Sequence, residues 1–276
     1  MGRNVERRLV VTVRDGEVGR RPDTLVGEEP MEVRVNGTAV SVTMRTPGND
    51  FELALGFACT EGIVDDPAEV QAVRYCVGAD VDEVQQYNVV DLRLVDGTRQ
   101  PADELRRNVY TTSSCGLCGT ASIDAVRKRV PDVSDDPLRM GPELLAQLPD
   151  RLRAAQKVFD RTGGLHAAAV FDPHGELVCL REDVGRHNAV DKVIGWAAMQ
   201  RRLPLRGHVL MVSGRVAFEI TQKALVAGLP MIAAVSAPSS LAVSLAESAG
   251  MTLVGFLRGT SMNIYTGAHR VVPTAS

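Results

Sequence analysis

The chain has 276 residues, a net charge of −3 and a pI near 6.0, so it lacks the basic excess of a general nucleic-acid-binding protein. Hydrophobic residues make up 45% and aromatic residues only 4%, which predicts an aliphatic core in one large domain or two ordinary ones. Five cysteines without framework spacing indicate a reducing compartment. No apolar run reaches the roughly 20 residues of a membrane helix, and Leu9 to Val13 is too short for a signal-peptide core. We therefore expect a soluble, cytoplasmic protein with no nucleic-acid or membrane partner.

The N-terminal part, residues 1 to about 108, reads as an antiparallel sheet with one embedded helix. Asn36-Gly37 between two alternating apolar runs is a strong hairpin signal. Asn49 or Asp50 is expected to cap a helix that is apolar nearly all round and ends at Gly62, which predicts that it is buried. The expected strands are Leu9 to Val13, Met31 to Met44 as a hairpin, Val70 to Val77, and Val84 to Val95.

Residues 109 to 124 hold two cysteines, Cys115 and Cys118, in a run of Ser, Thr and Gly. Such a run has little apolar surface to bury, which predicts a mobile surface loop. A helix is expected from Ser122, so Cys118 lies just upstream of a helix N-terminus, where the dipole favours a thiolate.

The Cys-x-x-Cys pair has three interpretations. It fits a disulfide redox couple, although a thioredoxin-like fold places the pair after a buried strand. It fits half of a zinc site, although the other cysteines, Cys59, Cys76 and Cys179, are single and no His pair has ligand spacing. It also fits a nucleophilic thiolate that carries a group such as a persulfide sulfur.

The C-terminal part alternates helices and short apolar strands, after a linker at residues 134 to 142. Pro149 predicts a break in an amphipathic helix over Pro142 to Phe159. The further expected strands are Ala167 to Phe171, Leu177 to Leu180, His208 to Val212, Met231 to Val235, Met251 to Leu257 and Asn263 to Tyr265. The further expected helices are Asn188 to Met199, Val216 to Ala227 and Ser239 to Ala249. This order predicts a three-layer α/β sandwich with a largely parallel sheet.

Three strand ends are rich in small polar residues: 213 to 215, 236 to 240, and 258 to 261. Ligands of such sheets bind beyond the carboxyl ends of the strands, and helix N-termini suit phosphate. We expect a pocket for a phosphorylated or nucleotide-like ligand there. A second polar segment, Arg181 to Asn188, contains His187, which fits either a base or ligand contact or a helix-capping loop with paired charges; His166 is similar.

Several long motifs resemble the FdhD family of formate dehydrogenase accessory sulfurtransferases. They are Cys-Gly-x-Cys-Gly, Arg-Thr-Pro-Gly-Asn-Asp-Phe-Glu-Leu-Ala-Leu-Gly-Phe at 45 to 57, Thr-Gly-Gly-Leu-His at 162 to 166, Arg-Glu-Asp-Val-Gly-Arg-His-Asn-Ala-Val-Asp-Lys at 181 to 192, Ser-Gly-Arg at 213 to 215, and Gly-Phe-Leu-Arg-Gly-Thr-Ser-Met-Asn-Ile-Tyr at 255 to 265.

The resemblance implies a sulfurtransferase that receives sulfur from a cysteine desulfurase as a persulfide on Cys115, with Cys118 as an auxiliary thiol. It implies delivery to the molybdenum cofactor, as bis(molybdopterin guanine dinucleotide), before the cofactor enters formate dehydrogenase. The implied cofactor contacts are Phe256, Leu257, Arg258, Gly259, Thr260 and Ser261. A homodimer is also implied by the resemblance.

The resemblance further implies a cytidine-deaminase-like C-terminal fold, but the deaminase zinc signature is absent from the sequence, so deamination and a metal are not expected. The expected division is a smaller, mainly antiparallel β domain at 1–108, the Cys-x-x-Cys loop and following helix at 109–135, and a cofactor-binding α/β domain at 136–276. The alternatives are a cofactor-binding chaperone that transfers no sulfur and a structural zinc protein.

Overall fold

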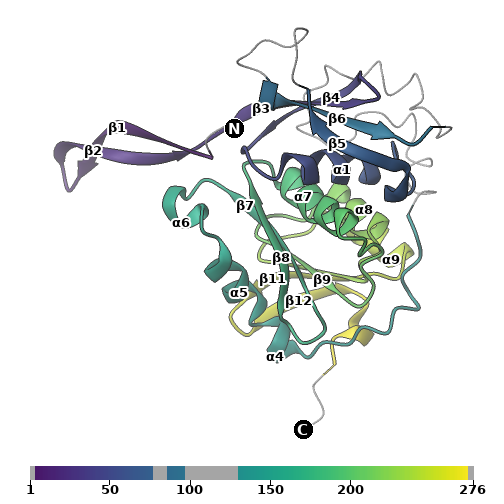
Figure 1. The fold of residues 1–276 in the computed structure, drawn as a ribbon. Helices are drawn as coiled ribbons and strands as arrows, with labels where there is room; N and C mark the ends of the chain where they lie inside the picture. The colour runs from purple at the N-terminus through teal and green to yellow at the C-terminus, as the bar shows by residue number, and fades with distance from the viewer. Residues whose placement is uncertain (1–3, 77–85, 97–129, 273–276) are drawn as a thin grey trace.

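The computed structural model describes residues 4–76, 86–96 and 130–272. Figure 1 shows two sheets, one in the upper part of the molecule and one in the lower part, with helices between them, and a two-stranded hairpin that projects to one side. The fold is mixed α/β with a β-rich N-terminal part, in agreement with the predicted class. The predicted loop with Cys115 and Cys118, and the helix expected after it, lie outside the described residues. The predicted domain limits stay a prediction.

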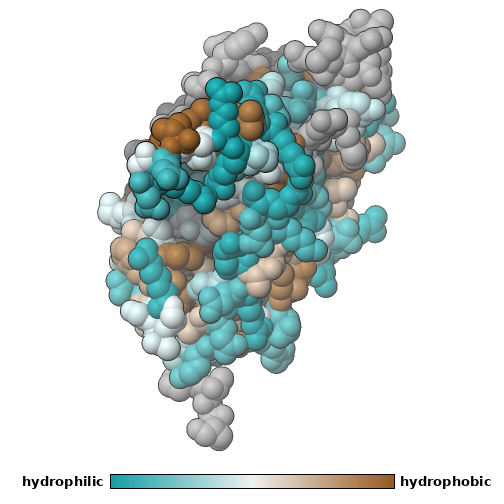
Figure 2. Space-filling model, turned by 90° about the vertical axis from the view of Figure 1, so that its left-hand side faces the viewer, coloured by the Kyte–Doolittle hydropathy of each residue, from teal (hydrophilic) through white to brown (hydrophobic). Residues whose placement is uncertain are grey.

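The projecting hairpin pairs β1 (Val5–Arg14) with β2 (Glu17–Val26) through a turn at Asp15-Gly16, where both residues have positive φ. The sequence pattern predicts only the first of these two strands. Apolar side chains on this hairpin remain exposed, with 66% exposure for Leu9 and 73% for Val18. Figure 2 looks onto this side of the molecule and shows hydrophobic patches set among hydrophilic ones.

The smaller sheet has four strands, in the order β4 (Thr38–Arg45), β3 (Glu29–Val35), β6 (Val89–Leu94) and β5 (Val70–Tyr75). The hairpin β3–β4 turns at Asn36-Gly37 as predicted, and the positive φ of both residues is what this turn requires. The sheet is mostly antiparallel, but β3 and β6 run parallel. Short 3₁₀ turns, η1 (Pro67–Glu69) and η2 (Gln86–Asn88), precede β5 and β6.

Helix α1 (Asp50–Thr60) covers this sheet and is buried along most of its length, which confirms the prediction from its apolar sequence. Cys59 lies in this core. The expected side-chain cap is wrong in detail. Asn49 occupies the N-cap position with a left-handed backbone but accepts no capping hydrogen bond, and Asp50 pairs with Arg45 instead.

The larger sheet has six strands, in the order β12 (Ser261–Thr266), β11 (Thr252–Arg258), β10 (Met231–Ala234), β9 (Val209–Val212), β7 (His166–Phe171) and β8 (Leu177–Asp183). Only β9, β10 and β11 are mutually parallel, whereas β7, β8 and β12 join antiparallel to their neighbours. The expectation of a largely parallel sheet was therefore wrong, because hairpins add antiparallel strands on both sides of the parallel centre.

Helices cover both faces of the larger sheet, which confirms three layers. One face carries α7 (Arg186–Met199), α8 (Phe218–Val226) and α9 (Ser240–Ser248) over an aliphatic cluster. The other carries α4 (Pro142–Leu145) and α5 (Leu148–Ala155), with α6 (Phe159–Thr162) beside them. The predicted break near Pro149 is the boundary between α4 and α5. A last 3₁₀ turn, η3 (Ala268–Arg270), follows β12, and none of the helices in the described ranges is long and apolar enough to cross a membrane.

Helices α1 and α7 lie side by side between the two sheets and join them (Figure 1). Their backbones approach closely at Gly56 and Gly195. A Cβ at Gly56 would clash with the carbonyl oxygen of Asp191, and a Cβ at Gly195 would clash with that of Glu52. Glycine at both positions is therefore what allows this crossing.

Candidate functional site

The three polar strand ends lie along one edge of the larger sheet. Because β9, β10 and β11 are parallel, the loops that follow them leave the sheet on the same side. The loops also bond to one another: the Val216 amide donates to Ala237 O at 3.1 Å, and the Phe256 amide donates to Ser236 O at 3.2 Å. The structure thus brings together the three segments that the sequence analysis grouped.

The segment predicted to contact the cofactor forms the β11–β12 turn, where Arg258 pairs with Ser261. A bulge lies between Gly255 and Arg258, and Phe256 has a positive φ of 50° and 40% exposure. The Arg258 Nε donates to Val235 O at 3.2 Å, while Gly259 and Thr260 are exposed. The Leu257 side chain is fully buried in the core beneath the sheet. Of the six predicted residues, Leu257 therefore offers only its backbone to a ligand.

A second polar segment comes to the same edge, which the sequence analysis did not foresee. β7 runs antiparallel to β9, and β8 runs antiparallel to β7, so β8 ends where β9 ends. His166 pairs with Asp183 in the sheet, and the Ala167 amide donates to the Ser213 hydroxyl at 2.9 Å. The turn at Asp172 to Gly175 is the sequence signal for this arrangement. Two strands that are joined by such a short turn run antiparallel, so the second strand must end at the edge where the first begins.

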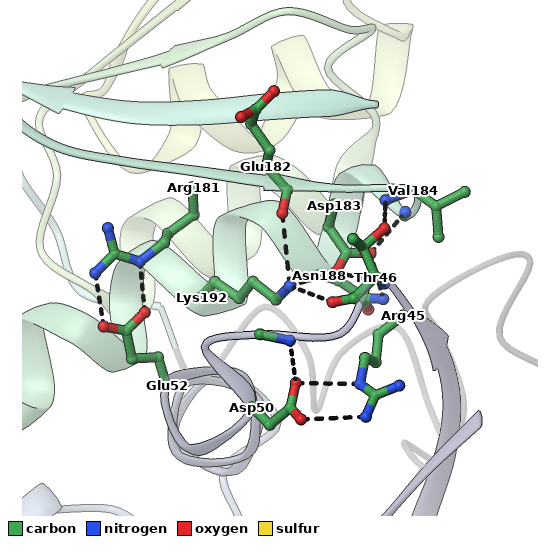
Figure 3. Close-up of polar contacts among 12 residues, drawn as sticks. Arg45, Thr46, Asp50, Glu52, Arg181, Glu182, Asp183, Val184, Asn188 and Lys192 are labelled. Carbon is green, nitrogen blue, oxygen red and sulfur yellow. Dashed lines mark hydrogen bonds and ion pairs between the residues drawn. The ribbon is translucent and has the colours of Figure 1, made fainter. Parts of the chain in front are cut away.

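Part of this segment is fully paired and holds the two halves of the molecule together (Figure 3). Asp183 forms an ion pair with Lys192 at 2.7 Å and accepts hydrogen bonds from the Thr46 amide at 3.1 Å and from the Asn188 side chain at 3.0 Å. Lys192 also donates to Thr46 O at 2.9 Å. All four residues are buried. We call Thr46, Asp183, Asn188 and Lys192 the paired cluster, and its role is structural.

Other ion pairs extend this connection between the segments around residues 45 to 61 and 181 to 223. Arg45 donates twice to Asp50, at 3.1 Å each, and Arg181 binds Glu52 through two guanidinium nitrogens. These bidentate contacts are visible in Figure 3.

Another buried ion pair joins α7 to α8, where Lys223 contacts Asp191 at 3.0 Å. Burial raises the pKa of Asp191 to about 6, against the lowering effect of Lys223. Burial acts to lower the pKa of Lys223, but the carboxylates of Asp191 and Glu61 outweigh it and raise the pKa overall.

Among the described residues, three other side chains at the same edge lack such partners. We call Arg186, His187 and Glu219 the open cluster. His187 Nε2 lies 4.0 Å from the nearer Glu219 oxygen, beyond hydrogen-bond distance, at side-chain exposures of 16% and 11%. The buried Arg186 Nε and His187 Nε2 have no hydrogen-bond partner among the described residues.

Burial and nearby cations both act on the histidines at this edge. Burial, reinforced by Arg186 and Lys223, lowers the pKa of His187 to about 4. Burial and Arg186 also lower the pKa of His166, with Asp183 opposing and Arg215 adding to the effect. At neutral pH His187 is therefore uncharged, and each of its ring nitrogens either donates or accepts a hydrogen bond.

A cleft of about 620 Å³ lies beside this edge, between α5, α6 and the ends of the strands. Its lining includes Arg153, Gln156, Phe159, Gly164, His166, Ser213 and Val235. One wall is fixed by Glu182, which accepts from the amides of Val158 and Phe159 at 3.0 and 2.8 Å. The volume lies within the range of small-molecule sites.

A second cleft, of about 660 Å³, lies between β5 and the C-terminal end of α7. Since α7 has 14 residues, this cleft is about 20 Å from the polar edge. Its lining is mainly apolar and includes Leu55, Val70, Met199 and Leu203.

The cysteines that the structure describes are poorly suited to nucleophilic chemistry. Burial raises the pKa of Cys59 and of Cys179 to about 12, and both thiols lie in the core. Cys76 is partly buried, and burial followed by Asp91 raises its pKa as well. Among the described residues, no three His, Cys, Asp or Glu side chains are grouped so that they could hold a metal ion.

Comparison with known proteins places the chain in a family. A family model described as FdhD/NarQ matches residues 26–272. "Sulfur carrier protein FdhD" of Streptomyces avermitilis is 61% identical over 278 residues, covering 100% of this chain and 99% of the relative. The protein of the same name from Mycobacterium tuberculosis is 54% identical over 279 residues, covering 98% and 100%. That from Saccharolobus solfataricus is 39% identical over 274 residues, covering 98% and 100%.

The fold matches a solved structure as well. The crystal structure of a formate dehydrogenase accessory protein from Desulfotalea psychrophila has a TM-score of 0.76 and 19% identity to this chain, and the match covers 98% of this chain and 100% of that one. The family-model match and the full-length relatives together establish that the chain belongs to the FdhD/NarQ family.

Proposed function

We propose that this protein is a sulfurtransferase that carries sulfur, as a persulfide on Cys115, to the cofactor of formate dehydrogenase in the cytoplasm. The observation that carries the proposal is the full-length similarity, up to 61% identical, to proteins named sulfur carriers. The deeply buried positions of Cys59 and Cys179 support a role for the Cys115/Cys118 pair, because buried thiols with raised pKa values react slowly.

The first step transfers sulfur without net oxidation. The Cys115 thiolate attacks the outer sulfur of a persulfide on a cysteine desulfurase. The S–S bond of the donor breaks, the desulfurase cysteine leaves as a thiolate, and the outer sulfur is now bonded to Cys115.

Release of that sulfur as hydrosulfide consumes two electrons and one proton. The Cys118 thiolate supplies both electrons when it attacks the Cys115 sulfur and forms a disulfide, and solvent supplies the proton. A thiol reductant then returns the pair to the reduced state.

The acceptor we propose is molybdenum bis(molybdopterin guanine dinucleotide), held at the polar edge of the larger sheet. The exposed donors and hydroxyls of Arg258, Thr260 and Ser261 fit phosphate groups, and Phe256 offers an exposed ring for stacking. The neighbouring N-termini of α8 and α9 add backbone amides. When bound, the cofactor supplies the metal that takes sulfur as a ligand. We further propose that the protein is a homodimer that transfers the cofactor to formate dehydrogenase.

The test measures sulfur on the protein directly. The purified chain is incubated with a cysteine desulfurase and L-cysteine, and its intact mass is measured. We expect a gain of about 32 Da, one sulfur atom, that reductant removes and peptide mapping assigns to Cys115. Cys115→Ala should lose the adduct, while the matched variant Cys76→Ala should keep it.

A different outcome would select the other function. If no adduct forms on either loop cysteine while the cofactor still binds, the protein is a cofactor-binding chaperone. An active, sulfurated formate dehydrogenase made in cells that carry only Cys115→Ala would also contradict the carrier role.

A further inference from the structure

The second cleft, between β5 and the C-terminal end of α7, takes no part in the polar edge of the larger sheet. It measures about 660 Å³, and the length of α7 places it about 20 Å from that edge. Residues 70 to 73, four consecutive residues of β5, line it. Successive side chains of a strand point to opposite faces of the sheet, so a cleft lined by all four runs along the edge of the strand.

This edge of β5 is unpaired among the described residues. β5 is the last strand of the smaller sheet and pairs there only with β6. The Cys76 amide donates to Val89 O at 2.9 Å, and residues bonded across an antiparallel ladder alternate along the strand. Val73 therefore turns its amide and carbonyl away from β6, toward the open side. An unpaired strand edge is a template for an added strand.

Apolar side chains line the cleft beside this edge. Leu55 is buried, Met199 is 45% exposed, and both belong to the lining. Val70, Val73 and Leu203 are partly buried and pack against the core of the smaller sheet. An extended chain that pairs with β5 can therefore place apolar side chains in the cleft, and this is how proteins bind peptides by strand addition.

The segment that carries Cys115 joins the described chain on this side of the molecule. At one end, the Val95 amide donates to Glu69 O at 2.8 Å, directly before the β5 residues of the cleft. Just beyond the other end, Asp135 forms an ion pair at 2.9 Å with Arg206, which follows the last residue of the cleft lining by three positions. A protein that must reach Cys115 therefore meets the second cleft close to both ends of this segment.

We propose that the second cleft and the free edge of β5 bind the sulfur donor, through an extended apolar segment of the cysteine desulfurase that pairs with β5. This inference rests on the proposed function, in which a desulfurase persulfide loads Cys115. Because α7 spans the distance from the cleft to the polar edge, donor and acceptor can be bound at the same time.

The experiment measures binding of the purified cysteine desulfurase of the same organism to the full chain by isothermal titration calorimetry. Met199→Lys places a cation at the C-terminus of α7, where the helix tolerates it, and puts a charge into the apolar cleft. It should weaken binding at least about tenfold. Leu177→Lys is the matched control, because Leu177 is 40% exposed, lies at the start of β8 and is outside the cleft. It should leave the affinity unchanged.

The rate of Cys115 loading separates docking from chemistry. At limiting desulfurase, Met199→Lys should load at least about tenfold more slowly than wild type. At saturating desulfurase, or with inorganic polysulfide as a small sulfur donor that needs no docking surface, it should load at the wild-type rate. Folding of both variants is checked by the thermal unfolding midpoint.

Hydrogen exchange on wild type tests the strand addition without any variant. The amides of β5 should exchange more slowly when the desulfurase is bound, because the added strand pairs with the free edge.

The inference is overturned if Met199→Lys binds the desulfurase as tightly as wild type, or if exchange in β5 is the same in the complex. A lower mass of Met199→Lys in light scattering would also overturn it, because the cleft then holds a second copy of the chain. So would polysulfide loading that falls as far as desulfurase loading, because the variant then acts on the segment with Cys115.

The two proposals fail separately. If wild type is loaded with sulfur but Met199→Lys binds the desulfurase normally, only this inference fails. If the desulfurase binds wild type through the cleft but no sulfur reaches Cys115, the carrier proposal fails and the docking surface stands.

Discussion

The paired cluster and the open cluster both use residues at the start of α7, but their hydrogen bonding differs. In the paired cluster, Asp183 receives hydrogen bonds and a cation from both halves of the molecule. In the open cluster, Glu219 has a histidine 4.0 Å away and no hydrogen bond among the described residues. Burial alone therefore does not separate a structural polar residue from a functional one. The difference lies in whether the described part of the chain supplies every partner.

The largest expected effect comes from breaking the paired cluster. Asp183→Ala leaves Lys192 buried without its carboxylate and removes the acceptor for the Thr46 amide, so we expect a loss of about 3–5 kcal/mol in the free energy of unfolding. Urea denaturation measures it. Asp160→Ala, which removes an exposed ion pair with Arg153, is the matched control and should cost less than about 1 kcal/mol. A loss for Asp183→Ala as small as the control's would mean that the cluster is not structural.

The close crossing of α1 and α7 predicts the next effect. In Gly195→Ala the new methyl group meets the backbone of Glu52, which no side-chain rotation can relieve, so we expect a loss of about 3 kcal/mol. Gly19→Ala is the control, because a Cβ there meets only the Thr12 hydroxyl at 3.7 Å in the exposed hairpin. Equal unfolding midpoints for the two variants would mean that the α1–α7 crossing does not require glycine at position 195.

The open cluster predicts a pH dependence centred on His187. Its pKa falls from 6.5 to about 4 on folding, so the unfolded chain takes up a proton between these pH values and the folded chain does not. Stability from this source is therefore present above pH 6.5 and lost as the pH falls toward 4. The shift corresponds to about 3 kcal/mol, and partial exposure of the ring reduces our expectation to about 2 kcal/mol.

The measurement compares urea midpoints of wild type and His187→Asn across this pH range. The variant should lose less stability on acidification than wild type, by about 2 kcal/mol at pH 4. Parallel profiles for the two proteins would show that His187 does not titrate differently on folding.

The smallest effect has the opposite sign. Glu219→Gln removes a buried charge that has no hydrogen bond among the described residues, so the free energy of unfolding should stay unchanged or rise by up to about 1 kcal/mol. Glu247→Gln, which makes the same change on the exposed face of α9, is the control. A clear loss of stability in Glu219→Gln would mean that Glu219 stabilises the fold, as the residues of the paired cluster do.

Sequence patterns predicted the elements in which apolar residues recur at strand or helix spacing. The hairpin at Asn36-Gly37 and the apolar helix after Asn49 are confirmed, because burial imposes a periodic pattern that can be read. The strand β2 was missed although Asp15-Gly16 is a good turn signal. Its residues, such as Arg20 and Arg21, lie on an exposed ribbon where no buried face constrains the sequence.

For the candidate site, sequence alone could group the strand ends but not the open cluster. Residues 256 to 261 were assigned to the site because they lie at the end of an apolar strand and match a family motif, and their contact with a cofactor stays a prediction. In the sequence, Glu219 looks like any acidic residue in the first turn of a helix. What distinguishes it is its distance from His187, which only the structure gives. The direction of β7 relative to β9, which places His166 and His187 at this edge, is likewise a tertiary property.

The glycine crossing of α1 and α7 also bears on how the molecule unfolds. Helix α1, which covers the smaller sheet, packs directly on α7, which covers the larger one. Buried ion pairs lie next to this contact. Loss of either half would expose the apolar side chains and charges that the other half buries at the α1–α7 contact, so we expect neither half to be stable alone. The described parts of the chain should therefore melt in one cooperative transition, with equal calorimetric and van't Hoff enthalpies.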